Sequence, residues 1–205
     1  QVDWASAEPG TSSNSEELPN IIIILADDLG WNDISFYGGG LGNGAVQTPN
    51  IDRIAAEGVH FSNGYAGNAT CAPSRAALLT GRYPTRYGFE FTPAPASLMS
   101  LVATFDSHRE QLHPGYFLEE NLSDFPPFEE QGVPTTEILL PEILASKDYH
   151  SILLGKWHLG ESEGYTPNDR GFDEFLGFLA GAAMFAEYDD PAMIKSKQEF
   201  DGIDQ

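Results

Sequence analysis

Cys71 is the only cysteine of this 205-residue chain, and it begins the run C-A-P-S-R (71–75), which L-T-G-R (79–82) follows. Pro73 and Gly81 bound a predicted helix over 73–79, so Cys71 is expected at a helix N-terminus. Such an end offers partial positive charge and backbone N–H groups, and Arg75 adds a guanidinium able to hold an anionic oxygen. The pattern favours oxyanion chemistry at Cys71, whereas a lone cysteine is more commonly a buried, inert residue.

Asp27 and Asp28 follow the aliphatic run I-I-I-I-L (21–25) in the phrase L-A-D-D-L-G-W. Two adjacent carboxylates at the end of a strand repel each other unless a cation lies between them. Oxygen ligands select a hard ion, Ca²⁺ or Mg²⁺, and not zinc. An aspartate after a strand is equally often a helix cap, so the pair alone leaves both interpretations open.

The run G-K-W-H-L-G (155–160) places Lys156 and His158 two residues apart at the end of another predicted strand. If the strand continues through the run, both side chains point to one face and Trp157 to the other. Both polar groups would then reach the same substrate. An isolated histidine is more often a satisfied structural residue, which is the alternative here.

These three segments, together with P-N-D-R-G-F-D-E-F (167–175), resemble the signature segments of the type I, formylglycine-dependent sulfatases of the alkaline phosphatase superfamily. The resemblance runs from about Ile21 to Phe178. It implies that a dedicated formylglycine-generating enzyme oxidises Cys71 to an aldehyde. One hydroxyl of the hydrated aldehyde would attack the sulfur of an aryl or carbohydrate sulfate, and the other would later release inorganic sulfate and restore the aldehyde.

The resemblance also assigns roles to the other residues. Lys156 would contact the sulfate and the diol, and His158 would hydrogen-bond or deprotonate the diol. Asp27, Asp28 and residue 71 would bind the metal ion, Ca²⁺ in preference to Mg²⁺. The segment 167–175 is expected to serve packing.

Two features depart from the family pattern. Many relatives carry a substrate-side histidine shortly after 167–175, whereas this chain reads G-A-A-M-F (181–185). The family's Asp-Asn metal ligands and second lysine come from a segment well downstream, which leads us to expect an incomplete ligand set in this chain. The alternatives are a phosphomonoester or phosphonate hydrolase of the same superfamily, and a catalytically incomplete fragment that only binds metal or a partner.

The order of elements predicts an α/β fold with a mostly parallel sheet flanked by helices on both faces, of the alkaline phosphatase type with its C-terminal part missing. Strands are expected at 21–25, 59–61 and 149–154, with 21–25 central. Helices are expected from Pro49 to Gly58, over 73–79, and over 142–147, where Pro141 either starts or kinks the helix.

Residues 1–20 are predicted to be a flexible polar linker, and residues 21–205 the N-terminal part of a catalytic domain with an insertion at about 95–134. A net charge of -21 makes binding to nucleic acid or anionic lipid unfavourable. No run is long enough to span a bilayer, and one cysteine excludes an intrachain disulfide. The start at Gln1 and the resemblance favour a periplasmic or extracellular protein.

Overall fold

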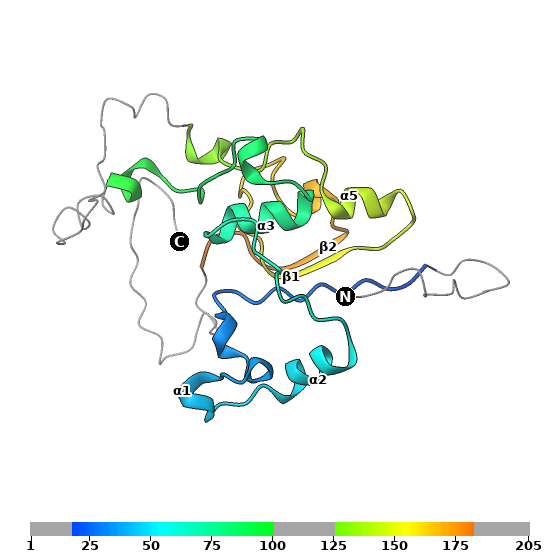
Figure 1. Ribbon diagram of the computed structural model, residues 1–205. Helices are drawn as coiled ribbons and strands as arrows, with labels where there is room; N and C mark the ends of the chain where they lie inside the picture. Colours follow the sequence, from blue (N-terminus) through cyan, green and yellow to red (C-terminus); the bar gives the residue numbers. More distant parts are fainter. Residues whose placement is uncertain (1–17, 101–125, 183–205) are drawn as a thin grey trace, which may run out of the picture. The chain divides into compact units, whose positions relative to one another are not determined.

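The computed structural model describes residues 18–100 and 126–182, and the chain divides into two compact units, Gln1–His60 and Phe61–Gln205 (Figure 1). Most of the predicted linker and residues 101–125 of the predicted insertion lie outside the described residues. No helix within the described ranges is both long and apolar enough to cross a membrane.

The first unit is built from short helical elements. Two 3-10 turns, Trp31–Asp33 and Ser35–Tyr37, precede the four-residue turn α1 (Leu41–Gly44) and the helix α2 (Pro49–Glu57). The predicted helix starting at Pro49 and ending at Gly58 is thereby confirmed.

Asp52 ties the first turn of α2 to the preceding loop. Its carboxylate accepts hydrogen bonds from the hydroxyls of Ser35 (2.6 Å) and Thr48 (2.7 Å) and from the backbone N–H of Phe36 (3.0 Å). These donors, with Ser35 the strongest influence, lower the pKa of the Asp52 carboxyl. The interaction fixes the start of α2 in the absence of a side-chain cap from Thr48 to the helix backbone.

Two strand predictions in this part of the chain are wrong. No strand is present at 21–25 or at 59–61. The five aliphatic side chains of 21–25 are 47% to 84% exposed. A strand forms only where neighbouring backbone satisfies its N–H and C=O groups, and the described residues supply one strand pair, elsewhere in the chain.

The second unit contains α3 (Cys71–Thr80), α5 (Leu140–Ala145), β1 (Ile152–Lys156) and β2 (Glu174–Phe178), with 3-10 turns at Pro84–Arg86, Phe128–Glu130 and Asn168–Arg170. Gly81 ends α3 in a left-handed conformation (φ 66°) and donates its N–H to Ala77, as a C-terminal glycine does. Pro141 lies in the first turn of α5, so it starts that helix and does not kink it.

β1 and β2 pair in parallel, with Leu153 opposite Phe175 and Leu154 opposite Leu176. The connection between them, residues 157–173, carries the larger part of two of the signature segments, G-K-W-H-L-G and P-N-D-R-G-F-D-E-F. Helices α3 and α5 lie on the same side of the strands (Figure 1), and Leu153 packs toward the buried core while Leu154 is 71% exposed. The parallel strand pairing, with helices packed on one side of the strands, is typical of an α/β fold.

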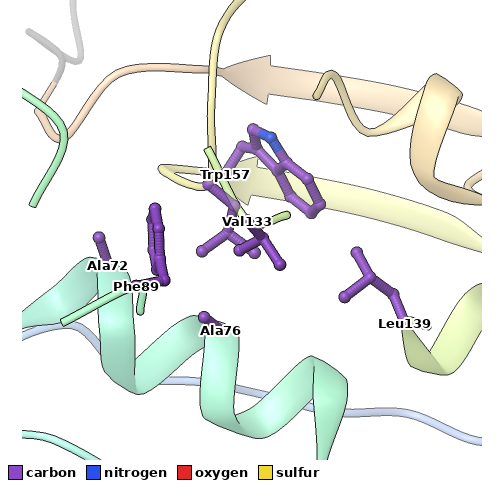
Figure 2. Close-up of a cluster of buried hydrophobic side chains, with 7 residues drawn as sticks. Ala72, Ala76, Phe89, Val133, Leu139 and Trp157 are labelled. Atoms are coloured by element: carbon purple, nitrogen blue, oxygen red, sulfur yellow. The ribbon is translucent and has the colours of Figure 1, made fainter. Parts of the chain in front are cut away.

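The core of this unit collects buried side chains from four places in the sequence: Ala72 and Ala76 on α3, Phe89, Val133 with Leu139, and Trp157 with Leu159. Figure 2 shows Trp157 and Val133 between the strands and α3. Trp157 is 1% exposed, and truncating an indole of this kind to alanine costs about 3–5 kcal/mol. Val133 is fully buried, so the end of the predicted insertion belongs to the core.

Candidate active site

Cys71 is the first residue of α3, which confirms its predicted place at a helix N-terminus. Thr70, at the N-cap position, turns its hydroxyl to Asn68 Oδ1 (3.1 Å) and does not cap the helix. Ala72 and Pro73 are buried and anchor the first turn, while Cys71 itself is partly exposed. The thiol therefore lies at the positive end of a ten-residue helix whose first turn is held by the core.

Arg75 connects this helix to the end of β1. Its Nη1 donates a hydrogen bond to the backbone oxygen of Lys156 at 2.8 Å, across 81 residues of sequence. The core makes the same connection, since Ala72 and Trp157 share one cluster (Figure 2). The structure thus brings together the segments that carry Cys71, Arg75, Lys156 and His158, and it gives Arg75 a structural bond beside its predicted role on an anionic oxygen.

The end of β1 differs from the sequence-based picture. The strand stops at Lys156, and His158 adopts a left-handed backbone conformation (φ 63°). Strict alternation of side chains therefore ends before His158, and the argument that Lys156 and His158 share one face through a continuous strand is wrong. Both residues remain at the carboxyl end of β1.

Trp157 closes the turn that follows. Its indole N–H donates to the backbone oxygens of Gly160 (3.0 Å) and Tyr165 (2.9 Å). Gly160 has a φ of 122° and would place any β-carbon 2.5 Å from that of Tyr165, so this position requires glycine. In G-K-W-H-L-G the strand β1 therefore ends at Lys156, and the residues after it form a turn that contains His158 and is fixed by the buried Trp157.

His158 is buried, at 5% exposed, and its backbone N–H donates to the oxygen of Leu179 at 2.8 Å. Glu161, at the far side of the turn, is partly buried, and this desolvation raises the pKa of its carboxyl. The turn thus holds a buried imidazole and a partly buried carboxyl group. No spacing rule in the sequence marks Glu161.

Asp27 and Asp28 belong to the first unit, and both are exposed. The next helical element begins at Trp31 with Gly30 at its N-cap position, and Asp33 accepts the Gly30 N–H at 2.8 Å. Neither Asp27 nor Asp28 therefore lies at the N-cap of the helical element that follows, and the sequence-based alternative of a cap is not what the structure shows.

The donor chemistry of this pair fits a hard cation, because both side chains offer only carboxylate oxygens. Two carboxylate side chains are fewer than the roughly six to eight oxygen ligands that a Ca²⁺ ion takes. Within the part of the chain that the structure describes, no group of three or more carboxylate, histidine or cysteine side chains is arranged so that it could hold a metal ion. Metal binding by Asp27, Asp28 and residue 71 stays a prediction.

Backbone conformation singles out two of the predicted site residues. Four non-glycine residues among those described have positive φ: Asp28 (59°), Asn43, Asp148 and His158 (63°). This conformation costs on the order of 1–2 kcal/mol per residue, and such strain collects at functional sites. Asn43 and Asp148 lie in turns at helix ends, where left-handed residues are usual. Asp28 and His158 do not lie at helix ends, so this explanation does not extend to them.

A buried arginine links the segment 167–175 to residues 133–142 through hydrogen bonds. Arg170, 2% exposed, donates to the backbone oxygens of Val133 (3.0 Å) and Glu137 (2.6 Å) and to Glu142 Oε1 (3.3 Å). The Glu137 carboxylate in turn binds Arg82, the last residue of L-T-G-R. The packing role expected for 167–175 rests on these bonds, which the sequence did not reveal because every partner is distant in the chain.

Comparison with known proteins agrees with this arrangement. The sulfatase family model matches residues 19–201, nearly the whole chain. The chain belongs to the sulfatase family. Human N-acetylgalactosamine-6-sulfatase is 39% identical over 181 residues, which are 88% of this chain and 29% of that protein. Human arylsulfatase A is 37% identical over 161 residues, which are 78% of this chain and 25% of that protein.

Among solved sulfatase-family relatives, the crystal structure of Ps i-CgsB in complex with k-i-k-neocarrahexaose aligns with a TM-score of 0.57 and 37% identity. The alignment covers 80% of this chain and 28% of that one. The predicted alkaline-phosphatase-like α/β fold is confirmed at this level. The chain spans between a quarter and three tenths of the relatives' length.

Proposed function

We propose that the protein hydrolyses sulfate esters, with Cys71 as the precursor of the nucleophile. The observation that carries the proposal is the joining of the Cys71 helix to the Lys156–His158 turn by the bond from Arg75 to the Lys156 oxygen. This bond brings the Cys71 helix, the Arg75 guanidinium and the backbone of Lys156 into one part of the unit. In a chain of net charge -21, with ten Lys and Arg residues, this region is suited to an anionic substrate.

Oxidation of Cys71 to formylglycine, by a separate formylglycine-generating enzyme, would supply a hydrated aldehyde as nucleophile. The chain's own residues would do the rest. The first turn of α3 orients residue 71 toward the substrate oxygens. Lys156 binds the sulfate and stabilises the charge that grows on its oxygens. His158 holds or takes the proton of the attacking hydroxyl, in a buried position that limits competition from water.

The substrate is proposed to be a sulfated carbohydrate or aryl sulfate. One relative is an N-acetylgalactosamine-6-sulfatase and the solved structure is a complex with a neocarrahexaose, so both point to sugars. We further propose that the protein acts in the periplasm or outside the cell, where it would meet sulfated carbohydrates. Initial rates with para-nitrophenyl sulfate and para-nitrophenyl phosphate, in the longest natural form of the protein, test the reaction class.

We expect a higher kcat/KM for the sulfate than for the phosphate by at least about tenfold, a difference of roughly 1.4 kcal/mol in transition-state stabilisation. Mass spectrometry of the Cys71 peptide is the matched control, since it reports whether the thiol has become an aldehyde. Preference for the phosphate in converted protein would favour the phosphomonoester or phosphonate hydrolase. Absence of turnover with either ester would favour a protein that only binds metal or a partner.

Asp27 and Asp28 are proposed to hold Ca²⁺ in preference to Mg²⁺, since a cation would relieve the repulsion between two adjacent carboxylates and neither residue lies at a helix N-cap. Asp28→Asn removes one charge at nearly constant shape, and it should weaken Ca²⁺ binding by about 10- to 100-fold in calorimetry. Asp33→Asn, in the same unit, removes an equal charge and should leave the affinity within about twofold. Equal affinity in Asp28→Asn and the unchanged protein would contradict the assignment.

A further inference from the structure

Gly181 lies directly against the imidazole ring of His158. A β-carbon at position 181 would be 2.6 Å from Cε1 and 2.7 Å from Nε2 of the ring, distances that real β-carbons do not show. The φ of Gly181 is outside the left-handed range, so its backbone conformation is open to any residue. Position 181 therefore requires glycine, because a side chain there would occupy the space that the His158 ring fills.

The ring has little freedom to move away. The end of β2 and the residue after it lie beside the turn: Trp157 N–H donates to Phe178 O (3.0 Å) and His158 N–H to Leu179 O (2.8 Å). His158 is buried, and its left-handed backbone sets where its side chain begins. Only two side-chain torsions remain to adjust, and both are restricted in a packed interior.

We propose that Gly181 is a positioning residue. Because it has no side chain, its backbone packs directly against the His158 imidazole and fixes the orientation of that ring at the end of β1. This inference rests on the proposed function, because it gives the contact a purpose only if His158 acts in sulfate-ester hydrolysis. Gly181 begins the run G-A-A (181–183), where many family members place a substrate-side histidine. In this chain Gly181 instead lies against a histidine that comes from another segment.

The test is Gly181→Ala in the protein that carries out the reaction, with Gly64→Ala as the matched control. At Gly64 the new β-carbon would make ordinary contact, 3.6 Å from Phe61, and its φ is likewise outside the left-handed range. We expect Gly181→Ala to lower kcat by about 10- to 100-fold, because small displacements of a catalytic group have effects of this size, with KM within about twofold. Gly64→Ala should leave both constants within about twofold.

A double-mutant cycle with His158→Ala separates positioning from general damage. If Gly181 acts through the ring, Gly181→Ala should cause no further loss once the ring is gone. The same loss in both backgrounds would overturn the proposal, as would wild-type kcat in Gly181→Ala. Full activity in His158→Ala would overturn the proposed use of His158, and the positioning role with it. Loss in His158→Ala alone would overturn only the positioning role.

A spectroscopic measurement covers the case in which Gly181→Ala reduces the yield of folded protein. Histidine-selective nitrogen NMR on the folded fraction reports the environment of the His158 ring, assigned with His158→Ala. The proposal expects these resonances to move in Gly181→Ala and to stay in place in Gly64→Ala. Unmoved His158 resonances in Gly181→Ala would overturn it.

Discussion

Cys71→Ala is expected to abolish turnover of sulfate esters while leaving the protein folded. The side chain at the start of α3 would be the only source of the nucleophile, and alanine can be neither oxidised to the aldehyde nor hydrated. Loss of a nucleophile in hydrolytic enzymes lowers kcat by about 10⁴- to 10⁶-fold. Cys71 is partly exposed, and its neighbours Ala72 and Pro73 hold the helix in place, so the thiol contributes little to stability.

The measurement compares initial rates with an aryl sulfate and thermal unfolding for the unchanged protein and the variant. Ser62→Ala, which deletes one polar atom from an exposed side chain in the same unit, is the control and should keep full activity. Conversion of Cys71 in the unchanged protein is verified by peptide mass. Residual turnover above about one part in a thousand in Cys71→Ala would contradict the assignment of the nucleophile.

The elements that the sequence predicted best are those with local signals. Pro49 and Gly58 mark the ends of α2, and Gly81 marks the end of α3, because each residue imposes or permits a backbone conformation without help from distant parts of the chain. The position of Cys71 at a helix start followed from the same local chemistry. The family segments extended this to Lys156 and His158, which lie at the end of β1 as expected.

The predictions that failed depended on partners remote in sequence. The run 21–25 has the composition of a buried strand, yet pairing is decided by a neighbour that composition does not name, and the structure has no strand there. The left-handed His158 was equally hidden, since it lies in a turn that the Trp157 bonds to Gly160 and Tyr165 close. Histidine is among the residues enriched at positive φ, but that preference does not mark a particular position in the sequence.

The hydrogen bonds of Arg170 were hidden from the sequence for the same reason, because its partners are distant in the chain. Arg170 reaches Val133, Glu137 and Glu142, between 28 and 37 residues away. A buried guanidinium is tolerated only when its donors are matched, and here three acceptors surround it. Val133 also donates its N–H to Leu159 O (3.0 Å), the residue after His158. Arg170 is therefore connected to the turn at 157–160 through the backbone of Val133. This connection exists only in the folded chain.

Lys156→Ala is expected to lower both kcat and kcat/KM for sulfate esters by about 10²- to 10³-fold. Charge develops on the sulfate oxygens as the ester bond breaks, and an ammonium group near them stabilises that state more than the bound substrate. The backbone oxygen that accepts the Arg75 bond is unaffected by the substitution, so the link between α3 and β1 should persist. Unfolding temperature should therefore change little, because the side chain is not part of the buried cluster.

Lys147→Ala is the matched control, since Lys147 is exposed in the same unit and lies just after α5. It removes an equal charge at a distance from the proposed site and should leave kcat/KM within about twofold. The two variants also separate local from general electrostatics: attraction of an anionic substrate by overall charge would give both the same modest loss, which added salt would erase. A rise in KM with unchanged kcat in Lys156→Ala would instead mean that the lysine binds the substrate and the transition state equally, and the catalytic role given to it would be wrong.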